Sequence, residues 1–405
     1  MTKEMRVFLV LALALLLVIV VLILIVVPRL PSDAHVPEEG VGRIGLGSDT
    51  VKAEVLDIVE EGTITLGDHI QPYQILSIEV LEGPWEGYGL EIDYGKRQLR
   101  PEGLTINPGD RVLIDIGQGP DGTLNAYFID FVRTGSVFWL FAAFVLFSIL
   151  IGGWKGVRGL MGMFISLAVI LIYIIPNIMQ GKDPVSISIV GASILLTITL
   201  YLVYGWTLKT HAAVLGLLIA LMFTGLVISF FVNLTRLTGF GNEDALFVIQ
   251  QSDIRINLRG LVLAGMLIGV LGALDDLVIT QASVVFELFA VDPTLEIGSL
   301  YRRAIHVGKD HVASMINTLV LAYVGAALPT MILFSLSGEH FVNLLNLEFV
   351  TEEVVRTLVG SIGLIAAAPI STGVTCLIAI NQHRLGSLRR YLGPEYLGEG
   401  YDQSH

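Results

Sequence analysis

Charged residues are scarce in this chain. Asp, Glu, Lys and Arg make up 15% of its 405 residues, hydrophobic residues make up 54%, and the mean hydropathy is +0.75. Typical soluble domains are about 25% charged and about 45–50% apolar, so this balance excludes an ordinary soluble globular protein. The 37 acidic residues outnumber the 24 basic ones, and the net charge of −13 argues against a nucleic-acid partner, which would select a basic surface.

Cysteine and enzyme signatures are nearly absent as well. The single cysteine, Cys376, excludes a disulfide framework and a cysteine-based metal cluster. The metalloprotease pattern H-E-x-x-H, the nucleophile elbow G-x-S-x-G and the P-loop do not occur in the sequence. We therefore expect no enzyme activity, no cofactor and no metal site.

Long apolar runs take up most of the chain instead. The first, Val7–Val27, has 21 residues without a charge, which is enough to cross a hydrocarbon core of about 30 Å and longer than the apolar region of a usual signal peptide. We expect residues 1–34 to be an uncleaved membrane anchor. Seven further runs make residues 132–382 a seven-helix membrane domain, eight spans in all: about 135–152, 159–177, 185–206, 210–232, 259–289, 311–335 and 354–380. The fifth of these is too long for one straight crossing, and Gly272 and two aspartates interrupt it.

Residues 35–131, between the first two spans, have a different character. Short strand-like stretches alternate there with Gly, Pro, Asp and Asn, which is typical of a small all-β domain. We expect an OB-like barrel. This region holds 18 acidic and 6 basic residues, so nearly all of the net negative charge belongs to it. The expected strands are Val51–Val59, Gln74–Leu81, Gly89–Tyr94, Arg111–Ile116 and Ala126–Phe131.

The distribution of Lys and Arg predicts the orientation in the membrane. If the N-terminus is cytoplasmic, 11 basic residues lie in cytoplasmic connections and 7 in the short outer ones, as the positive-inside rule requires. With eight spans, the tail 383–405 is then cytoplasmic too, and the β domain is extracytoplasmic. The lipid bilayer is the expected first partner of the chain.

The strongest chemical signal is a polar stripe in the fifth of the seven runs. Asp276, Thr280, Ser283 and Glu287 follow one another at helical spacing, so they share one face of a helix. Ionisable residues within a membrane span are costly and usually functional. Asp275 precedes an apolar stripe, so Asp276 is the better candidate for a lined cavity. The alternative is that the span ends near Leu274, and that both aspartates belong to a cytoplasmic amphipathic helix.

Two later spans place polar groups at a similar depth. At 1.5 Å per residue, Asp276 and Thr372 each lie about 23 Å from the outer boundary. The last span contains Ser371 and Thr372 between Pro369 and Gly373, where a broken helix could free carbonyl groups for a cation or a small solute. Simple helix-to-helix hydrogen bonding and a proline kink remain alternatives. The span at 311–335, between the run that carries Asp276 and the last span, carries Asp310, Ser314, Asn317 and Thr318 at or near its start, at helical spacing.

At these residues the chain resembles the YibE/F-like family of bacterial multi-spanning membrane proteins. Asp276 and Thr280 match a family pattern of an aspartate followed four residues later by a small hydroxyl residue. Asp275 stands where the family more often has an apolar residue, and Lys309 where it often has Arg. The resemblance implies the architecture and a bacterial plasma membrane, and it implies no particular activity. The matching stretches are Asn257-Leu258-Arg259-Gly260, Gly272-Ala273-Leu274-Asp275-Asp276, Asp292-Pro293, Gly308-Lys309-Asp310 and Met315-Ile316-Asn317-Thr318-Leu319.

Three functional hypotheses follow from the sequence. The first is a transporter or permease in which Asp276 couples to protons or cations, because a carboxyl group inside a membrane can change its protonation near neutral pH. The second is a non-transporting scaffold or sensor whose outer β domain binds a partner in the cell envelope. The third and least supported is an intramembrane hydrolase, in which Asp276 would need a second aspartate such as Asp310.

Overall fold

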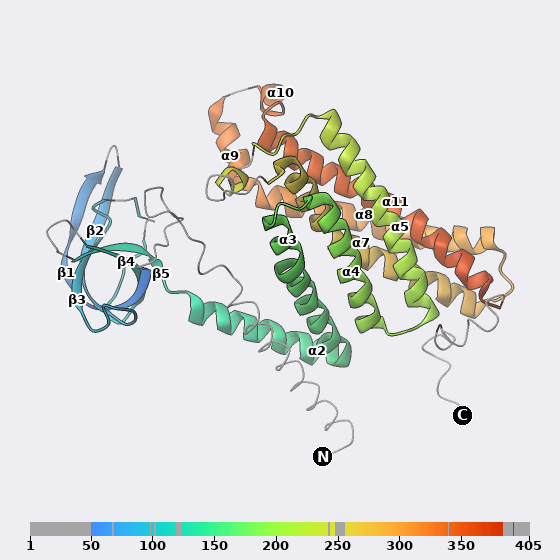
Figure 1. The fold of residues 1–405 in the computed structure, drawn as a ribbon, viewed down its shortest axis with the longest axis horizontal. Coiled ribbons are helices and arrows are strands. Elements are labelled where there is room, and N and C mark those ends of the chain that lie inside the picture. The colour runs from blue at the N-terminus through green and yellow to red at the C-terminus, as the bar shows by residue number, and fades with distance from the viewer. Residues whose placement is uncertain are drawn as a thin grey trace, which may run out of the picture. The chain divides into compact units, whose positions relative to one another are not determined.

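A computed structural model describes residues 50–66, 69–97, 99–100, 103–118, 124–241, 244–247, 256–338, 340–383 and 392. The chain forms two compact units, one of residues 35–147 and one of the remaining residues. Figure 1 shows the strands of the first unit and the helices of the second. The expected anchor helix at Val7–Val27 and nearly all of the tail 383–405 lie outside the described residues.

The first unit contains one antiparallel sheet with the strand order β3-β2-β1-β4-β5. Each strand overlaps an expected one, and alternate side chains are buried, as a sheet with one packed face requires. Val55, Leu76, Ile78, Ile92 and Ile114 lie in its core. The strands are β1 (Thr50–Leu66), β2 (His69–Val80), β3 (Gly89–Tyr94), β4 (Arg111–Gln118) and β5 (Leu124–Phe131).

The expected closed barrel is wrong, because the sheet is open. No ladder of backbone hydrogen bonds joins the edge strands β3 and β5 in the described residues. Aromatic side chains meet there instead, with the ring centroid of Tyr94 at 4.8 Å from that of Phe128 and 6.1 Å from that of Phe131. Rings of this size fill the space between the two edges and bury apolar area without a ladder, and six-residue β3 is short for a closing strand.

Strands β1 and β2 continue past the sheet as a two-stranded ribbon. A cluster of side chains across the two strands stabilises this ribbon within a defined pH range. Tyr73 donates a hydrogen bond to Glu60, and Lys96 Nζ lies 3.4 Å from Glu60 Oε1. The hydrogen bond lowers the pKa of Glu60 from its ordinary 4.5 and raises the pKa of Tyr73 from its ordinary 10.0. A carboxyl group whose pKa is lowered by folding stabilises the folded domain above pH 4.5, and a tyrosine whose pKa is raised by folding stabilises it below pH 10.0. The hydrogen bond between the two therefore gives its full contribution to stability between these pH values.

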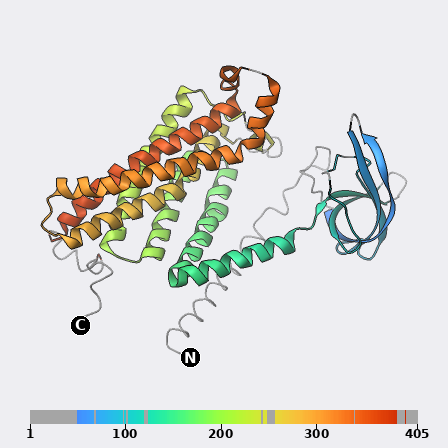
Figure 2. The same cartoon turned by 180° about the vertical axis from the view of Figure 1, so that it is seen from behind.

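Long helices make up the second unit, and Figure 2 shows them from behind. The expected spans 135–152 and 159–177 belong to one helical run that changes direction at Gly153, whose backbone (φ 53°, ψ −131°) is not helical. The run consists of α2 (Thr134–Ala168), η2 (Val169–Ile174) and α3 (Ile175–Met179), and the other helices are α4 (Pro184–Tyr204), α5 (Leu208–Leu234), α7 (Leu258–Val291), α8 (Ile297–Ala326), α9 (Leu328–Ser337), α10 (Phe341–Leu344) and α11 (Glu348–Ile380).

The described residues hold five helices that are long and apolar enough to cross a membrane. A sixth span results if α8 and α9 count as one, although the chain bends by 61° between them. The expected number of about eight is not confirmed, because two expected spans share one helical run and the first run is not described. Two expected interruptions are also not observed, since α7 continues through Asp275 and Asp276, and α11 continues through Pro369.

Helices α5, α7 and α11 form the centre of the bundle. Glycines let them approach closely: a Cβ atom at Gly216 of α5 would lie 3.1 Å from the Cα of Ser371. Further along the same pair, a Cβ at Gly363 of α11 would lie 2.6 Å from Thr224 Oγ1. These two contacts show that α5 and α11 run antiparallel. Apolar side chains on the outside, such as Leu226 of α5, are exposed, which suits a lipid environment.

Candidate functional site

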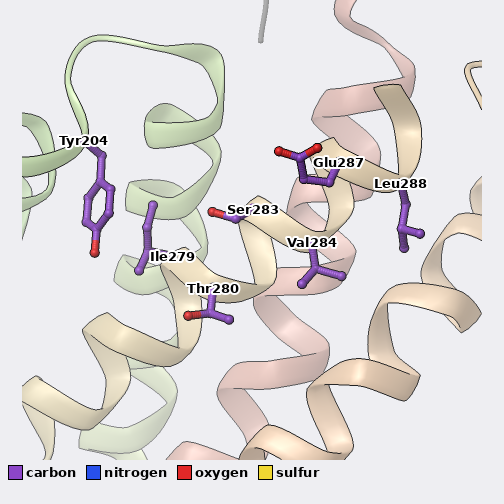
Figure 3. Close-up of a pocket in the computed structure, with 7 residues that line it drawn as sticks. All are labelled: Tyr204, Ile279, Thr280, Ser283, Val284, Glu287 and Leu288. Carbon is purple, nitrogen blue, oxygen red and sulfur yellow. The ribbon is translucent and has the colours of Figure 1, made fainter. Parts of the chain in front are cut away.

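The polar stripe of α7 lines an open pocket. Thr280, Ser283 and Glu287 contribute to its wall, together with Ile279, Val284 and Leu288 of the same helix and Tyr204 at the end of α4. The pocket has a volume of about 390 Å³. Figure 3 shows the hydroxyl groups of Thr280 and Ser283 pointing to the side of α7 on which Tyr204 lies. A polar face of a candidate membrane span therefore borders a space that is wide enough for several water molecules.

Two neighbouring carboxyl groups lie one helical turn before this pocket. Asp276 is 62% exposed, and its Oδ2 lies 3.6 Å from Nε2 of His311 on α8. Asp275 is half-buried, and its Oδ1 is buried without a hydrogen bond. Both carboxyl groups interact electrostatically with the Tyr204 hydroxyl. The site thus combines a carboxyl group and an imidazole that approach each other across two helices with a carboxyl oxygen that has no donor.

A second polar cluster is buried between α7 and α11. Thr372 donates a hydrogen bond to Gln281 Oε1 at 2.9 Å, and Ser371 donates to the backbone oxygen of Val278 at 3.2 Å. Gln281 and both hydroxyl residues are fully buried, and Gln281 Nε2 has no hydrogen-bond partner. A Cβ atom at Gly308 of α8 would lie 2.7 Å from this nitrogen. Three helices therefore meet at Gln281.

The structure separates the expected site residues into two groups. It brings Ser371 and Thr372 against α7, at about 12 Å from the end of α11 by the helical rise. It leaves the four polar residues of α8 on an exposed face: Asp310, Ser314, Asn317 and Thr318. Thr318 donates its hydroxyl proton to the backbone oxygen of Ser314 at 3.1 Å.

A charged cluster near the start of α11 was not expected from the sequence. Glu352 is 5% exposed and accepts a hydrogen bond of 2.6 Å from Arg356 Nη2, one turn later. Arg356 Nε also lies 3.4 Å from Glu353 Oε2, and Tyr323 of α8 interacts electrostatically with Arg356 and Glu353. The outer end of the bundle, in the orientation expected above, therefore holds a second set of ionisable groups.

Three partners in these clusters were missed: Gln281, His311 and Glu352. Gln281 interrupts an apolar run directly after Thr280, and His311 directly follows Asp310. Both were recognisable as polar residues in or beside a span. Glu352 lies before the expected start of the last span at 354, and only the helix that begins at Glu348 places it inside the bundle. Among the described residues, no group of three or more His, Cys, Asp or Glu could hold a metal ion.

Comparison with known proteins identifies the family of this chain. Neither curated proteins nor solved structures gave a match. The family model described as YibE/F-like protein matches residues 140–381, which include α4, α5, α7, α8 and α11 and each polar cluster of the helices described above. The match extends over more than half of the 405 residues. The apolar helices and this match together indicate a membrane protein, and the chain belongs to the YibE/F-like family.

Proposed function

We propose that this protein is a membrane transporter that moves protons or other small cations through the site at Asp275 and Asp276. The observation that supports this most is the pocket, because its hydroxyl groups and Glu287 lie on the helix that carries both aspartates. Ionisable and hydroxyl side chains at a membrane span mark ion pathways in other membrane proteins. A small solute could be carried together with the cation.

His311 gives the site a second proton-exchanging group. Its Nε2 is 3.6 Å from Asp276 Oδ2, so a small side-chain movement would bring the two within hydrogen-bonding distance. An imidazole and a carboxyl group can pass a proton between them once they are hydrogen-bonded. Asp275, with an unpaired buried oxygen, can hold the next proton. In this mechanism the pocket supplies water and the two carboxyl groups pass the ion onward.

The positive-inside rule assigns the pocket to the cytoplasmic side of a bacterial plasma membrane. Helix α8 carries Arg302, Arg303 and Lys309 in its first four turns, directly after the loop that follows α7, and basic residues concentrate on the cytoplasmic side. In the same orientation both termini are cytoplasmic and residues 35–131 are extracytoplasmic, provided that the helical run bent at Gly153 crosses the membrane twice and the chain has eight spans.

A blocked pocket tests the proposal. The full chain in proteoliposomes, with a potassium–valinomycin potential and an entrapped pH dye, should admit protons faster than protein-free liposomes. A Ser283→Trp variant should lower this flux by about tenfold or more, because the indole fills the space through which the ion is solvated. Leu226→Trp is the matched control, since Leu226 is 70% exposed on α5 and faces away from the bundle. Equal flux in the Ser283→Trp variant and the unchanged protein would contradict the proposal.

A second candidate function concerns the β domain. Residues 35–147 form a compact unit with a hydrophobic core of their own, and the β1–β2 ribbon exposes three apolar side chains, Leu56, Val59 and Ile70. Exposed apolar side chains of this kind suit contact with an envelope protein. We infer that this domain is a partner-binding module, as expected of a membrane scaffold or sensor that does not itself transport.

A further inference from the structure

Helix α8 presents a polar face that nothing in the described chain covers. Asp310, Ser314, Asn317 and Thr318 are all exposed. The opposite face is packed, with Gly308 against Gln281 of α7 and Leu319 against Gly360 of α11. At helical spacing the exposed face continues through the small residues Ala313 and Gly325 and through two larger side chains, Leu321 and Val324, which are 59% and 37% exposed.

This face lies at the depth of the middle of the bundle. Two residues of α11 show how deep this face lies. Gly360 contacts Leu319 of α8, and Thr372 bonds to Gln281, which contacts Gly308 of α8. Gly360 and Thr372 are both well inside the 33-residue helix α11. By the rise of 1.5 Å per residue, each is about 12 Å or more from the nearer end of α11. Asn317 and Ser314 therefore lie at hydrocarbon depth once the bundle is in a membrane.

Lipid chains cannot satisfy these polar groups. The Asn317 amide has two donor hydrogens and an acceptor oxygen, and none of the described residues forms a hydrogen bond or an ion pair with its side chain or with that of Asp310. Thr318 is satisfied by its own helix. An amide left unpaired in hydrocarbon carries a large desolvation penalty, so a protein surface must cover this side of α8.

We propose that a second copy of this chain covers the exposed face of α8, so that two α8 helices pack side by side in a parallel dimer. Both copies have the same orientation in the membrane, so the two-fold axis is parallel to the membrane normal and each residue lies near its own counterpart. An amide is self-complementary, because it donates to and accepts from an identical amide. Asn317 can thus pair with Asn317 of the other copy, and Lys309 with Asp310.

The apolar N-terminal run is a poorer occupant. Residues 7–27 contain no hydroxyl, amide or charged side chain, so they could exclude lipid and yet leave Asn317 unpaired. The small side chains of Ala313 and Ser314, next to Asn317 on this face, suit helix-to-helix contact, because they let two backbones approach closely enough for short polar side chains to reach each other. The second copy answers both requirements.

Cross-linking tests this dimer, and the single cysteine simplifies the experiment. Cys376 is fully buried, so an introduced cysteine is the reactive thiol of the chain. In membranes treated with copper–phenanthroline, Ala313→Cys and Ser314→Cys should form disulfide-linked dimers, since a disulfide needs Cα atoms about 4.4–6.8 Å apart. Leu226→Cys, on the lipid-facing side of α5, is the matched control and should remain monomeric.

The amide itself is tested by counting subunits. Asn317→Leu keeps the size of the side chain and removes the hydrogen bonds, so the dimer fraction in nanodiscs, measured by single-molecule photobleaching, should fall several-fold. Asn317→Gln should retain it. Absence of dimers in every α8 variant would overturn the proposal. So would a cross-link within one chain between Ser314→Cys and Leu16→Cys, which would assign the face to the N-terminal run. Both readouts are independent of transport, so they can fail while the proposed function holds.

Discussion

Changing both Asp275 and Asp276 to Asn should lower the proton flux of the protein in proteoliposomes by about tenfold or more, because asparagine cannot bind and release the transported proton. The fold should tolerate the change. Asparagine has nearly the same shape, Asp276 is largely exposed, and the buried Oδ1 of Asp275 has no hydrogen bond to lose. The measurement is the initial rate of internal acidification at a fixed membrane potential.

Single variants and a control show which carboxyl group matters. Asp276→Asn removes the partner of His311, whereas Asp275→Asn removes the half-buried group and leaves that pair intact. Glu296→Gln, an exposed acid at the start of α8 outside the site, is the matched control for the loss of negative charge. It should keep the flux within about twofold, as expected when only distant surface charge changes. Full proton flux in the double variant would contradict a role of these carboxyl groups in transport.

The second large effect concerns stability. Arg356→Met should lower the free energy of unfolding by about 3–5 kcal/mol, because it leaves the Glu352 carboxylate buried without its partner. Glu352 is only 5% exposed, and Arg356 donates to it at 2.6 Å. Unfolding in mixed micelles by increasing SDS, followed by tryptophan fluorescence, measures the difference.

A double variant separates the ion pair from the packing of Arg356. Glu352→Gln together with Arg356→Met should regain most of the lost stability, because no buried charge is then left unpaired. Arg302→Met is the control, since Arg302 is exposed and donates only to the backbone of Gly298 in its own helix. It should change stability by less than about 0.5 kcal/mol. A double variant as unstable as the single one would assign the effect to packing.

The elements of this fold were largely predictable because their signals are local. The strand expected at Gly89–Tyr94 has those bounds in the structure, and the helix expected at about 185–206 is α4, Pro184–Tyr204. Alternating apolar residues predict a half-buried strand, and long apolar runs predict a buried or membrane-spanning helix, from the local sequence alone. The extension of β1 to Leu66 was missed, because Glu60, Glu61 and Gly62 resemble a turn, whereas the structure pairs them with β2 after two register shifts.

What could not be predicted depends on contacts between distant residues. Nothing local distinguishes an open sheet from a closed barrel, because the aromatic seam between β3 and β5 joins residues far apart in sequence. The 61° bend after α8 and the kink at Gly153 depend on packing in the same way. Helical spacing did place Thr280, Ser283 and Glu287 on one wall. It could not tell that the polar residues of α8 lie on the outside.

Chemical modification of a Ser283→Cys variant tests the central claim, that a water-filled pocket with cation preference leads to the aspartates. Cys376 is buried and should not react. The rate of each reagent with the introduced cysteine is first divided by its rate with a free thiol. The corrected rate should be about tenfold higher for the cationic trimethylammonium-ethyl methanethiosulfonate than for the anionic sulfonatoethyl reagent, because neighbouring carboxylates concentrate cations. This preference should fall in the Asp275→Asn, Asp276→Asn background, in which Glu287 still lines the pocket. A cysteine at 283 that does not react, or that reacts equally with both reagents, would contradict the account.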